Sequence, residues 1–542
     1  MSKTNGAQGV LRTKVIIVGG GPVGLAMSLL LGRFEIDHLL VERAAGTTDH
    51  PKARGVDIRT MELFRLWGVE RKIAARGLPP GADVFAIVDT IAGAEYGRTV
   101  AELNLGQSPS WRCMVAQDAV EEELLTVARS QAHGQLRFGT EFVSFDAGND
   151  GVKARLRDLA SGEEEEWSAD FLVGADGAGS NVRRQADIEM RGPSTIAVMA
   201  NEYWSADLSH IPRIDATAAY RIVPKAPDHA IWTVLNTNGR DRWLSAGPVG
   251  KESDERPLPR TDAEVVQMAR NQTGLPNLDV KVISRSTWRL SRQVANRFSR
   301  GRVFVVGDAA HRFPPNGGFG MNSGIQDAHN LAWKLKLVLD GQAGGALLNS
   351  YDTERRPVAE SNADFSLGNQ KRFVQTDIAL RSGNRDQIEF WLRDTDNHLH
   401  SSGQSLGFSY EEGAVVPDGT VRMPLQSRYY SPSDRPGGRF PHLWMDLART
   451  ESTLDWFDRD FVLVYGPRGE DWIGVAREVA ARTGVHIGAR QLDTQDSRHG
   501  ISMGQRGATL VRPDGHVAWR SAWVPADPVA ALGSALDTIL CR

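Results

Sequence analysis

A glycine-rich turn between an apolar strand and an apolar helix lies near the start of this 542-residue chain and restricts its fold more than any other feature. Residues 14–18 read as a buried strand, Gly19, Gly21 and Gly24 follow in the spacing G-x-G-x-x-G, and residues 25–32 read as the helix. Glycines at these positions make the turn tight, let a diphosphate approach the backbone and let the helix pack on the sheet. The segment therefore predicts the first βαβ unit of a Rossmann-like α/β fold.

An acidic residue ends the next apolar run. Residues 38–41 read as a second strand, and Glu42 follows directly. A carboxylate at this place binds both hydroxyls of a ribose, so the expected ligand is a dinucleotide whose adenosine ribose carries no phosphate. We include Pro22, Val23 and Arg43 in the expected contact surface. A βαβ turn with a purely structural role is the alternative, which the joint presence of strand, glycines, helix and acid disfavours.

Two later segments also place a glycine and an acid after an apolar strand. The first runs through residues 171–174 to Asp176 and Gly177, and then to a helix whose expected N-cap is Ser180. In isolation it would be read as a strand followed by a polar turn. Its similarity to the other two segments favours a place in the same ligand site.

The second of these segments runs through residues 303–306 to Gly307 and Asp308, and a glycine-rich loop then leads to a helix that begins near Met321. A carboxylate at the carboxyl end of a parallel strand can accept hydrogen bonds from a polyol. The following helix N-terminus offers free N–H groups and a positive dipole end. We therefore expect the three segments to meet around one ligand.

The composition is that of a large globular protein. A hydrophobic fraction of 41% supplies ample core, and a net charge of -4 gives no reason to expect a nucleic acid or a membrane surface as partner. No apolar run is long enough to span a bilayer and residues 1–10 do not read as a secretion signal, so we expect a cytoplasmic protein. Cys113 and Cys541 form neither a dithiol nor a metal cluster. We expect no metal site, and redox chemistry requires a cofactor.

Together the three motifs resemble those of the flavoprotein aromatic hydroxylases, the single-component FAD monooxygenases typified by para-hydroxybenzoate hydroxylase and phenol hydroxylase. The resemblance extends over roughly residues 12 to 365. It implies that the first glycine-rich turn and Glu42 hold the ADP half of FAD. It also implies that Asp176 and Gly177 lie beside the pyrophosphate and that Gly307 and Asp308 hold the ribityl chain.

The resemblance also assigns residues around the flavin ring. Lys52, where an arginine is more usual, and Gln117 match positions beside the flavin. Gly320, Met321 and Asn322 match the helix start at the isoalloxazine ring, and we expect the backbone N–H groups of the last two to stabilise negative charge at flavin N1 and O2. The two residues expected to be catalytic are Arg54, facing the substrate, and Pro315, shaping the ring face where oxygen is activated.

The chemistry that the resemblance implies is a monooxygenation. NADPH or NADH binds transiently and reduces FAD, O2 reacts with the reduced flavin, and the C4a-hydroperoxide hydroxylates a small phenolic or polycyclic aromatic substrate. Tyr220, Arg221 and Trp232 are candidate substrate contacts, although strand parity leaves each one's direction open. A Baeyer–Villiger oxygenase of the same fold and, in another class, a non-catalytic flavin-binding protein are the alternatives. A halogenase and a disulfide reductase are disfavoured, since no Trp-x-Trp and no close cysteine pair occurs.

The domain organisation follows from the same resemblance. The expected FAD-binding domain, of the glutathione reductase type, comprises residues 12–75, 112–188 and 289–400, and the insertions 76–111 and 189–288 are expected to form one substrate-binding β-sheet. Residues 401–438, rich in Gly, Ser and Pro, read as a linker, and residues 439–542 resemble a thioredoxin-like C-terminal domain. Because that domain lacks Cys-x-x-Cys, we expect a structural or oligomerisation role for it, in a monomer or a homodimer.

Overall fold

The computed structural model describes residues 11–50, 52–223, 230–250, 260–493 and 500–542. Its centre is a six-stranded sheet in the order β18-β19-β10-β2-β3-β6. From β19 to β6 neighbouring strands are parallel, whereas β18 is antiparallel to β19. These strands are β2 (Val15–Val18), β3 (His38–Glu42), β6 (Gly134–Phe138), β10 (Phe171–Gly174), β18 (Ser299–Arg300) and β19 (Val303–Val305). The sequence-based prediction of a Rossmann-like α/β fold is confirmed.

The central sheet strands are apolar because helices cover them. Strands β2 and β10 are buried at every position, as is usual for parallel strands between helical layers. Helix α1 packs against both α4 and α7. The helices of this unit are α1 (Pro22–Arg33), α2 (Ile58–Leu66), α3 (Glu70–Ala74), α4 (Gln117–Ser130), α5 (Asn181–Gln185) and α7 (Phe319–Leu339). Parallel pairing brings the carboxyl ends of β3, β10 and β19 to one edge, where their acids follow.

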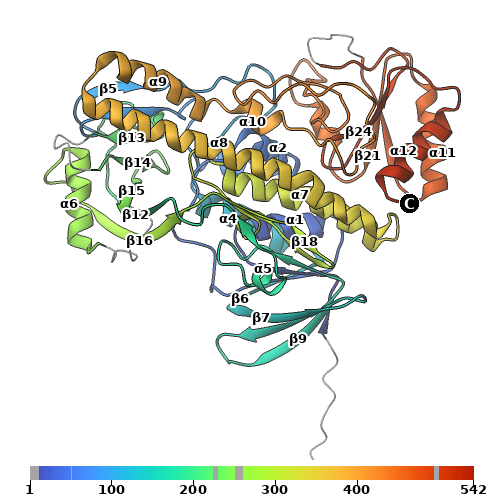
Figure 1. The fold of residues 1–542 in the computed structure, drawn as a ribbon, viewed down its shortest axis with the longest axis horizontal. Helices are drawn as coiled ribbons and strands as arrows, with labels where there is room; N and C mark the ends of the chain where they lie inside the picture. The colour runs from blue at the N-terminus through green and yellow to red at the C-terminus, as the bar shows by residue number, and fades with distance from the viewer. Residues whose placement is uncertain (1–10, 51, 224–229, 251–259, 494–499) are drawn as a thin grey trace, which may run out of the picture.

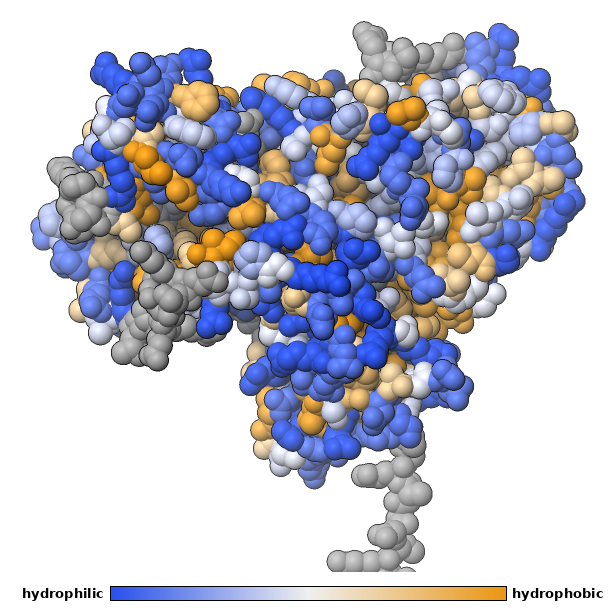
Figure 2. All heavy atoms as spheres, in the orientation of Figure 1, coloured by the Kyte–Doolittle hydropathy of each residue, from blue (hydrophilic) through white to orange (hydrophobic). Residues whose placement is uncertain are grey.

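Smaller elements complete this part of the chain. A four-stranded sheet, β1-β9-β8-β7, forms a lobe at the bottom of Figure 1, and its surface is mainly hydrophilic in Figure 2. Three further short strands form a separate sheet, β11-β17-β20. Their bounds are β1 (Leu11–Arg12), β7 (Thr140–Ala147), β8 (Val152–Asp158), β9 (Glu164–Ala169), β11 (Met190–Arg191), β17 (Gln293–Ala295) and β20 (His311–Arg312).

A seven-stranded sheet in the order β16-β12-β15-β14-β13-β4-β5 stands beside the central unit (Figure 1). Its strands come from both predicted insertions, because β4 pairs in parallel with β13. Helix α6 (Asp262–Thr273) packs through Val265 and Ala269 into the apolar cluster on one face. The strands are β4 (Phe85–Val88), β5 (Glu95–Arg98), β12 (Ala197–Ser205), β13 (Ala219–Ile222), β14 (Trp232–Asn236), β15 (Arg242–Gly250) and β16 (Lys281–Leu290), with the 3-10 turn η1 at Ile214–Ala216. The domain boundaries predicted from the sequence remain predictions.

The longest helix, α8 (Asn349–Ser382), follows the 3-10 turn η3 (Gly345–Leu348) and runs from the C-terminal part of the molecule to the seven-stranded sheet (Figure 1). Helices α9 (Arg385–Leu399) and α10 (Ser402–Leu406) come next. The segment predicted as a linker is packed at its start, where α10 is buried throughout and Tyr410 is 4% exposed, whereas residues 417–424 are exposed. Glycine and proline content alone does not report packing against another part of the chain.

The C-terminal unit contains a four-stranded sheet in the order β22-β21-β23-β24 with two helices. Its elements are η4 (Thr453–Trp456), β21 (Phe461–Tyr465), α11 (Asp471–Thr483), β22 (Ile487–Gln491), β23 (Ala508–Val511), β24 (Val517–Ser521) and α12 (Pro528–Ile539). The predicted hairpin at Pro513-Asp514-Gly515 joins β23 to β24. Strand β22 escaped the sequence reading because only its first residue is buried. Among the described helices, none combines the length and the apolar composition needed to cross a membrane.

The two cysteines differ in environment, which gives a simple test of the fold. Cys113 is buried and Cys541 is exposed, and burial raises the pKa of the Cys113 thiol to about 12. At pH 8 only about one Cys113 thiol in 10⁴ is then a thiolate. We expect one thiol per native chain to react promptly with a chromogenic thiol reagent, and two in denaturant. The variant Cys541→Ser should have no fast thiol, and a fast reaction of that variant would contradict the buried position of Cys113.

Candidate functional site

The glycine-rich turn after β2 is held by backbone contacts that leave no room for side chains. Gly19 has φ +112°, and a Cβ there would lie 2.3 Å from the Ala175 carbonyl oxygen. A Cβ on Gly24 would lie 1.9 Å from the Gly19 carbonyl oxygen. At Gly21, by contrast, a Cβ would meet no described protein atom within 4 Å. The turn is therefore closed on its protein side and open above Gly21, where a diphosphate would approach.

Glu42 ends β3 next to this turn. Its Oε2 accepts a hydrogen bond of 2.7 Å from the backbone N–H of Gly20, and its Oε1 accepts one of 2.8 Å from Ala44. The carboxylate is thus fixed beside the turn, in the position expected of a ribose-binding acid. The neighbouring Arg43 is exposed.

Asp308 lies in the 3-10 turn η2 (Gly307–Ala309) that follows β19. Its side chain is exposed, whereas the residues on either side are buried, and it has no hydrogen-bond partner among the described residues. Desolvation by the surrounding protein raises its pKa, and the charges of His311, Arg312 and Lys52 oppose that rise. A free carboxylate in such a recess is suited to accept hydrogen bonds from a polyol chain.

A buried acid holds the Asp308 turn in place. Asp327 Oδ2 accepts from the backbone N–H of Gly307 at 3.2 Å and contacts His311 Nε2 at 2.7 Å. Its other oxygen accepts from Arg355 Nε at 2.8 Å. His311 is fully buried, so it organises the loop and does not face a substrate. Arg355 belongs to the stretch Tyr351-x-x-Glu354-Arg355-Arg356-Pro357, which resembles the family pattern, whereas no sequence motif points to Asp327.

Helix α7 begins at Phe319, with Gly318 as its N-cap at φ +74°. By the geometry of a helix start, the amides of Phe319, Gly320 and Met321 have no helical partner. The expected role of the Met321 and Asn322 backbone N–H groups at the flavin ring remains a prediction. These three free amides point from a helix end with positive dipole character.

Asn322 acts through its side chain. Its Oδ1 accepts from the backbone N–H of Asp57 at 3.1 Å, and its Nδ2 donates to the carbonyls of Gly55 at 3.0 Å and Gly318 at 2.6 Å. The residue is 1% exposed. It therefore joins the start of α7 to the segment 52–57 that the sequence predicts beside the flavin.

Gln117 at the start of α4 supports the same segment. Its Oε1 accepts from the backbone N–H of Ala53 at 3.0 Å, and its Nε2 donates to Glu121 at 2.6 Å. Lys52, one residue earlier, is exposed, and its charge acts on Asp308. The structure thus brings Lys52 and Gln117 to the recess that holds Asp308.

Asp176 has a local role that the sequence did not predict. Its carboxylate accepts from the Ser180 hydroxyl and from the backbone N–H groups of Asn181 at 2.6 Å and Val182 at 3.1 Å. It therefore caps the start of α5. Gly177 adopts φ +74°, a conformation that favours glycine. Contact of both residues with a pyrophosphate remains a prediction.

Arg54 reaches from segment 52–57 to the seven-stranded sheet. Its Nη1 donates to the Ala218 carbonyl and, at 3.0 Å, to the Asn236 carbonyl. Burial, and then the nearby charge of Arg112, lower the pKa of Arg54. Neither guanidinium forms an ion pair with a described acid. Pro315, also predicted to be catalytic, is exposed, and its carbonyl accepts from the Gly318 N–H at 3.0 Å at the start of α7.

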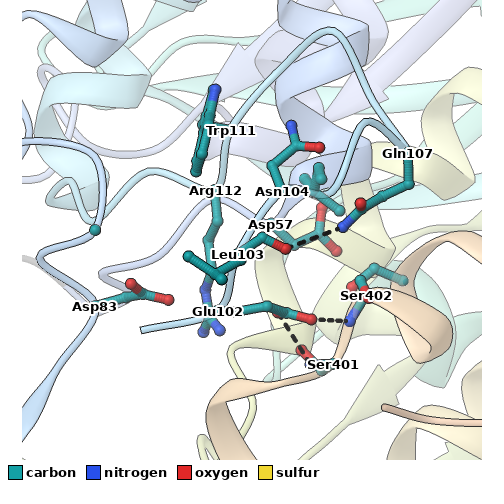
Figure 3. A pocket seen from close by; sticks show the side chains of 13 residues that line it. Asp57, Asp83, Glu102, Leu103, Asn104, Gln107, Trp111, Arg112, Ser401 and Ser402 are labelled. Carbon is teal, nitrogen blue, oxygen red and sulfur yellow. Dashed lines mark hydrogen bonds between the residues drawn. The ribbon is translucent and has the colours of Figure 1, made fainter. Parts of the chain in front are cut away.

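Arg112 of this pair lines a small pocket. Figure 3 shows the Arg112 side chain directed between Asp83 and Glu102. Arg112 Nη1 donates to the Leu399 carbonyl at 2.8 Å, while its buried Nε has no partner. Asp57 also lines the pocket and has one buried oxygen without a partner. The sequence analysis missed Arg112 and Asp57, since only the fold brings them to the start of α7.

The three candidate substrate contacts lie on two faces of the seven-stranded sheet. Tyr220 belongs to the apolar cluster under α6, and Trp232 pairs across the strands with Ile222 of that cluster. Arg221 points to the other face, where it pairs with Asp377 of α8. Tyr220 and Trp232 therefore lie on the face that α6 covers, and their contact with a substrate remains a prediction. The physical reason is strand alternation, because adjacent residues face opposite sides.

The opposite face of this sheet, on the Arg221 side, meets the FAD-binding part. His50 contacts Ser284 Oγ at 2.6 Å and Ser286 Oγ at 3.0 Å. Both serines lie on β16, which pairs with β12. The sequence analysis did not single out His50. Arg54 and His50 together fix the loop after β3 against the substrate sheet.

The described residues fit FAD by their own geometry. The open space above Gly21 suits a diphosphate, Asp308 offers an unpartnered carboxylate, and α7 offers three free amides at the far end of the same recess. The cations Lys52 and Arg312 lie close enough to Asp308 to affect its pKa. The site thus joins a nucleotide-binding turn to a helix start, and Arg54 connects this part of the chain to the seven-stranded sheet.

Comparison with known proteins agrees with this geometry. The family model described as FAD binding domain matches residues 12–366, and the model described as aromatic-ring hydroxylase, C-terminal, matches residues 433–542. A 4-methyl-5-nitrocatechol 5-monooxygenase of Burkholderia sp is 34% identical, with 98% of each chain covered. A putative polyketide hydroxylase of Streptomyces halstedii is 35% identical, again over 98% of each chain.

Among solved structures, the flavin-dependent monooxygenase PieE in complex with FAD and substrate superposes with a TM-score of 0.90. It is 32% identical and the match covers 98% of this chain and 99% of that one. The similarity therefore includes the C-terminal unit as well as the central sheet.

Proposed function

The chain belongs to the FAD-binding aromatic-ring hydroxylases, and from this premise we propose that it hydroxylates a phenolic ring held as its phenolate beside Arg54 and Arg112. It is an FAD-dependent monooxygenase, with O2 as co-substrate and NAD(P)H as reductant. The observation that carries the proposal is the half-buried pair of guanidinium groups, Arg54 and Arg112, without ion-pair partners among the described residues. An anionic ligand is the missing partner of such a pair.

Different residues bind the ADP half and the ring end of FAD. The turn at Gly19–Gly24 and Glu42 bind the ADP half, Asp308 holds the ribityl chain, and the free amides of α7 stabilise negative charge on the ring. When bound, the flavin supplies electrons taken from NAD(P)H and the activated oxygen that the substrate receives. Arg54 orients the phenolate and keeps its ring electron-rich, and the seven-stranded sheet excludes water.

The substrate class follows from the shape of the site and from its relatives. The pocket beside Arg112 offers acids, a guanidinium and the aromatic ring of Trp111, a lining suited to a hydroxylated ring system with more than one polar edge. Relatives bear the names of a nitrocatechol monooxygenase and a polyketide hydroxylase. We propose a phenolic substrate whose size lies between that of a nitrocatechol and that of a polyketide. We also propose that the enzyme is a cytoplasmic monomer or homodimer.

A substrate panel tests this function. Phenol, nitrophenols, nitrocatechols, hydroxyphenyl acids and polycyclic quinones are offered with NADPH and with NADH, and reductant consumption is compared with hydroxylated product and released hydrogen peroxide. We expect hydroxylated product from one of these phenolic classes in near-equal amount to the reductant consumed. Consumption that yields only peroxide with every compound would contradict the phenolate proposal while leaving the flavin assignment intact.

The charge of Arg54 gives a second prediction. Arg54→Met should lower kcat/KM about 30-fold, corresponding to loss of a charge-assisted hydrogen bond of about 2 kcal/mol. A neighbouring cation lowers the pKa of a bound phenol, so removing it raises that pKa and moves the rising limb of the pH profile to higher pH. The absorbance of a bound nitrophenol, titrated against pH, measures this shift. Arg54→Lys keeps the charge, so the rising limb of its pH profile should lie at the wild-type pH. If the wild type, Arg54→Met and Arg54→Lys all show the same rising limb, Arg54 does not contact a phenolate.

A further inference from the structure

The C-terminal domain meets the FAD-binding part through buried charges. Arg512, just after β23, donates from Nη1 and Nη2 to the two oxygens of Glu354 in α8, at 2.8 and 2.9 Å, and it also pairs with Asp514. The three side chains are at most 2% exposed. Burial opposes ionisation of Asp514, yet the Arg512 guanidinium holds the pKa of that carboxyl well below its usual range. The contact between Arg512 and Glu354 forms only when the C-terminal domain is docked.

Helix α7 takes part in the same cluster. Lys334 Nζ donates to Glu354 Oε2 at 2.8 Å and to Asn330 Oδ1 at 2.8 Å, and Asn330 Nδ2 donates to Glu354 Oε2 at 2.7 Å. Trp333 Nε1 donates to Asp514 at 3.2 Å. Arg512 and Asp514 therefore lock together α7 and α8, the two helices that support the cofactor recess.

The residue that follows Glu354 carries the connection to the cofactor recess. Arg355 donates to Asp327 Oδ1 at 2.8 Å, and Asp327 Oδ2 accepts from the backbone N–H of Gly307 at 3.2 Å. Gly307 precedes Asp308, the proposed ribityl contact. One turn of α8 thus binds the C-terminal domain through Glu354 and the Asp308 turn through Arg355. A shift of α8 at Glu354 would move both.

A second buried link leads to the other side of the recess. Arg439 Nε of the C-terminal domain donates to Glu62 Oε2 at 3.0 Å in α2, and Arg59 Nη2 donates to the Asp514 carbonyl at 2.8 Å. Arg439 and Glu62 side chains are each 1% exposed. Helix α2 begins at Ile58, directly after segment 52–57. The C-terminal domain therefore contacts α8, which supports the Gly307–Asp308 turn, and α2, which follows segment 52–57.

We propose that the C-terminal domain is a working part of the FAD site, in which Arg512 acts as a positioning residue for the Gly307–Asp308 turn through Glu354, Arg355 and Asp327. The domain lacks a redox-active cysteine pair, so its contribution is to hold α2, α7 and α8 in the arrangement that binds FAD. Affinity for FAD then depends on contacts made by the Arg512 side chain outside the cofactor recess.

The test uses the full-length protein, prepared without flavin and titrated with FAD by fluorescence quenching. For Arg512→Met we expect the Kd for FAD to rise at least about tenfold, within the usual range of coupling between two sites. The visible absorption spectrum of the flavin, recorded at saturating FAD, should also change. The matched control is Asp471→Asn, which removes an exposed ion pair with Arg506 in the same domain. It should leave both measurements at their wild-type values.

A milder variant and a double-mutant cycle decide the remaining outcomes. Arg512→Lys keeps the charge but cannot form the bidentate contact of a guanidinium with Glu354. We expect its Kd for FAD to lie between those of the wild type and Arg512→Met, and this variant serves even where Arg512→Met is not recovered in folded form. Combining Arg512→Lys with Asp327→Asn should give non-additive changes in the Kd, because both residues act on one chain of contacts. Wild-type Kd and spectrum in Arg512→Lys, or strictly additive effects, would overturn the proposal and leave the assignment of an aromatic hydroxylase untouched.

Discussion

Asp308→Ala should yield protein that is largely colourless after purification. The carboxylate has no hydrogen-bond partner among the described residues, so in the FAD complex it can give its full hydrogen-bonding capacity to the ribityl hydroxyls. Loss of charge-assisted hydrogen bonds worth about 3 kcal/mol in total weakens FAD binding by about 100-fold. Titration of the apoprotein with FAD measures the Kd directly.

The stability of the same variant separates a ligand contact from a structural one. Asp308 makes no hydrogen bond to a described residue, so its removal breaks no contact that supports the fold. Desolvation by the surrounding protein raises the pKa of Asp308, which disfavours its ionised form in the folded chain. Asp308→Ala apoprotein should therefore melt at or above the wild-type temperature. A lower melting temperature together with an unchanged Kd for FAD would show that Asp308 supports the fold and not the cofactor.

Gly21→Ala and Gly24→Ala should fail in different ways, and the pair tests the glycine-rich turn. A Cβ at Gly21 meets no described atom within 4 Å, and the backbone there, at φ -74° and ψ -176°, suits alanine. We expect Gly21→Ala apoprotein to be as stable as wild type but to bind FAD about 100-fold more weakly, because the methyl group occupies the diphosphate space. The Kd for FAD and the melting temperature of the apoprotein are the two measurements.

Gly24→Ala meets the protein itself. Its Cβ would lie 1.9 Å from the Gly19 carbonyl oxygen, a distance that forces α1 and the turn apart. The expected loss is more than about 3 kcal/mol of folding free energy, the cost of severe overpacking. Chemical denaturation of the apoproteins measures it, with Gly533→Ala as a control, since that glycine in α12 has open space. Normal FAD binding by Gly21→Ala would place the diphosphate elsewhere.

Local patterns predicted much of the cofactor site. The strands at residues 15–18, 38–42 and 171–174 were read from apolar runs, and Glu42, Asp176 and Asp308 were placed at one edge because parallel strands end together. The comparison with known families confirmed FAD and aromatic hydroxylation. These predictions succeeded because the turn, the strand and the acid are close in sequence, so their chemistry can be read without the rest of the fold.

Other parts of the site were beyond local reading. Tyr220 and Trp232 were assigned to the substrate, but strand parity turned them toward α6, and only the pairing with β4 and β15 fixes that parity. The side chain of Asn322 joins the start of α7 to Gly55 and Asp57, a contact that no local pattern predicts. Arg112 and Asp57 carry no motif, and the folded loops bring them to the start of α7.

The sequence by itself indicated the cofactor and the class of reaction through the family resemblance of its three motifs, because each motif can be read within its own short segment. Only the tertiary structure decided which side chains share a face of the seven-stranded sheet, how Arg54 and Arg112 come together, and that Arg512 and Asp514 of the C-terminal domain are buried against α7 and α8. These features join residues from 58 to 181 positions apart, and their energies depend on burial and distance. Such quantities exist only once the chain has folded.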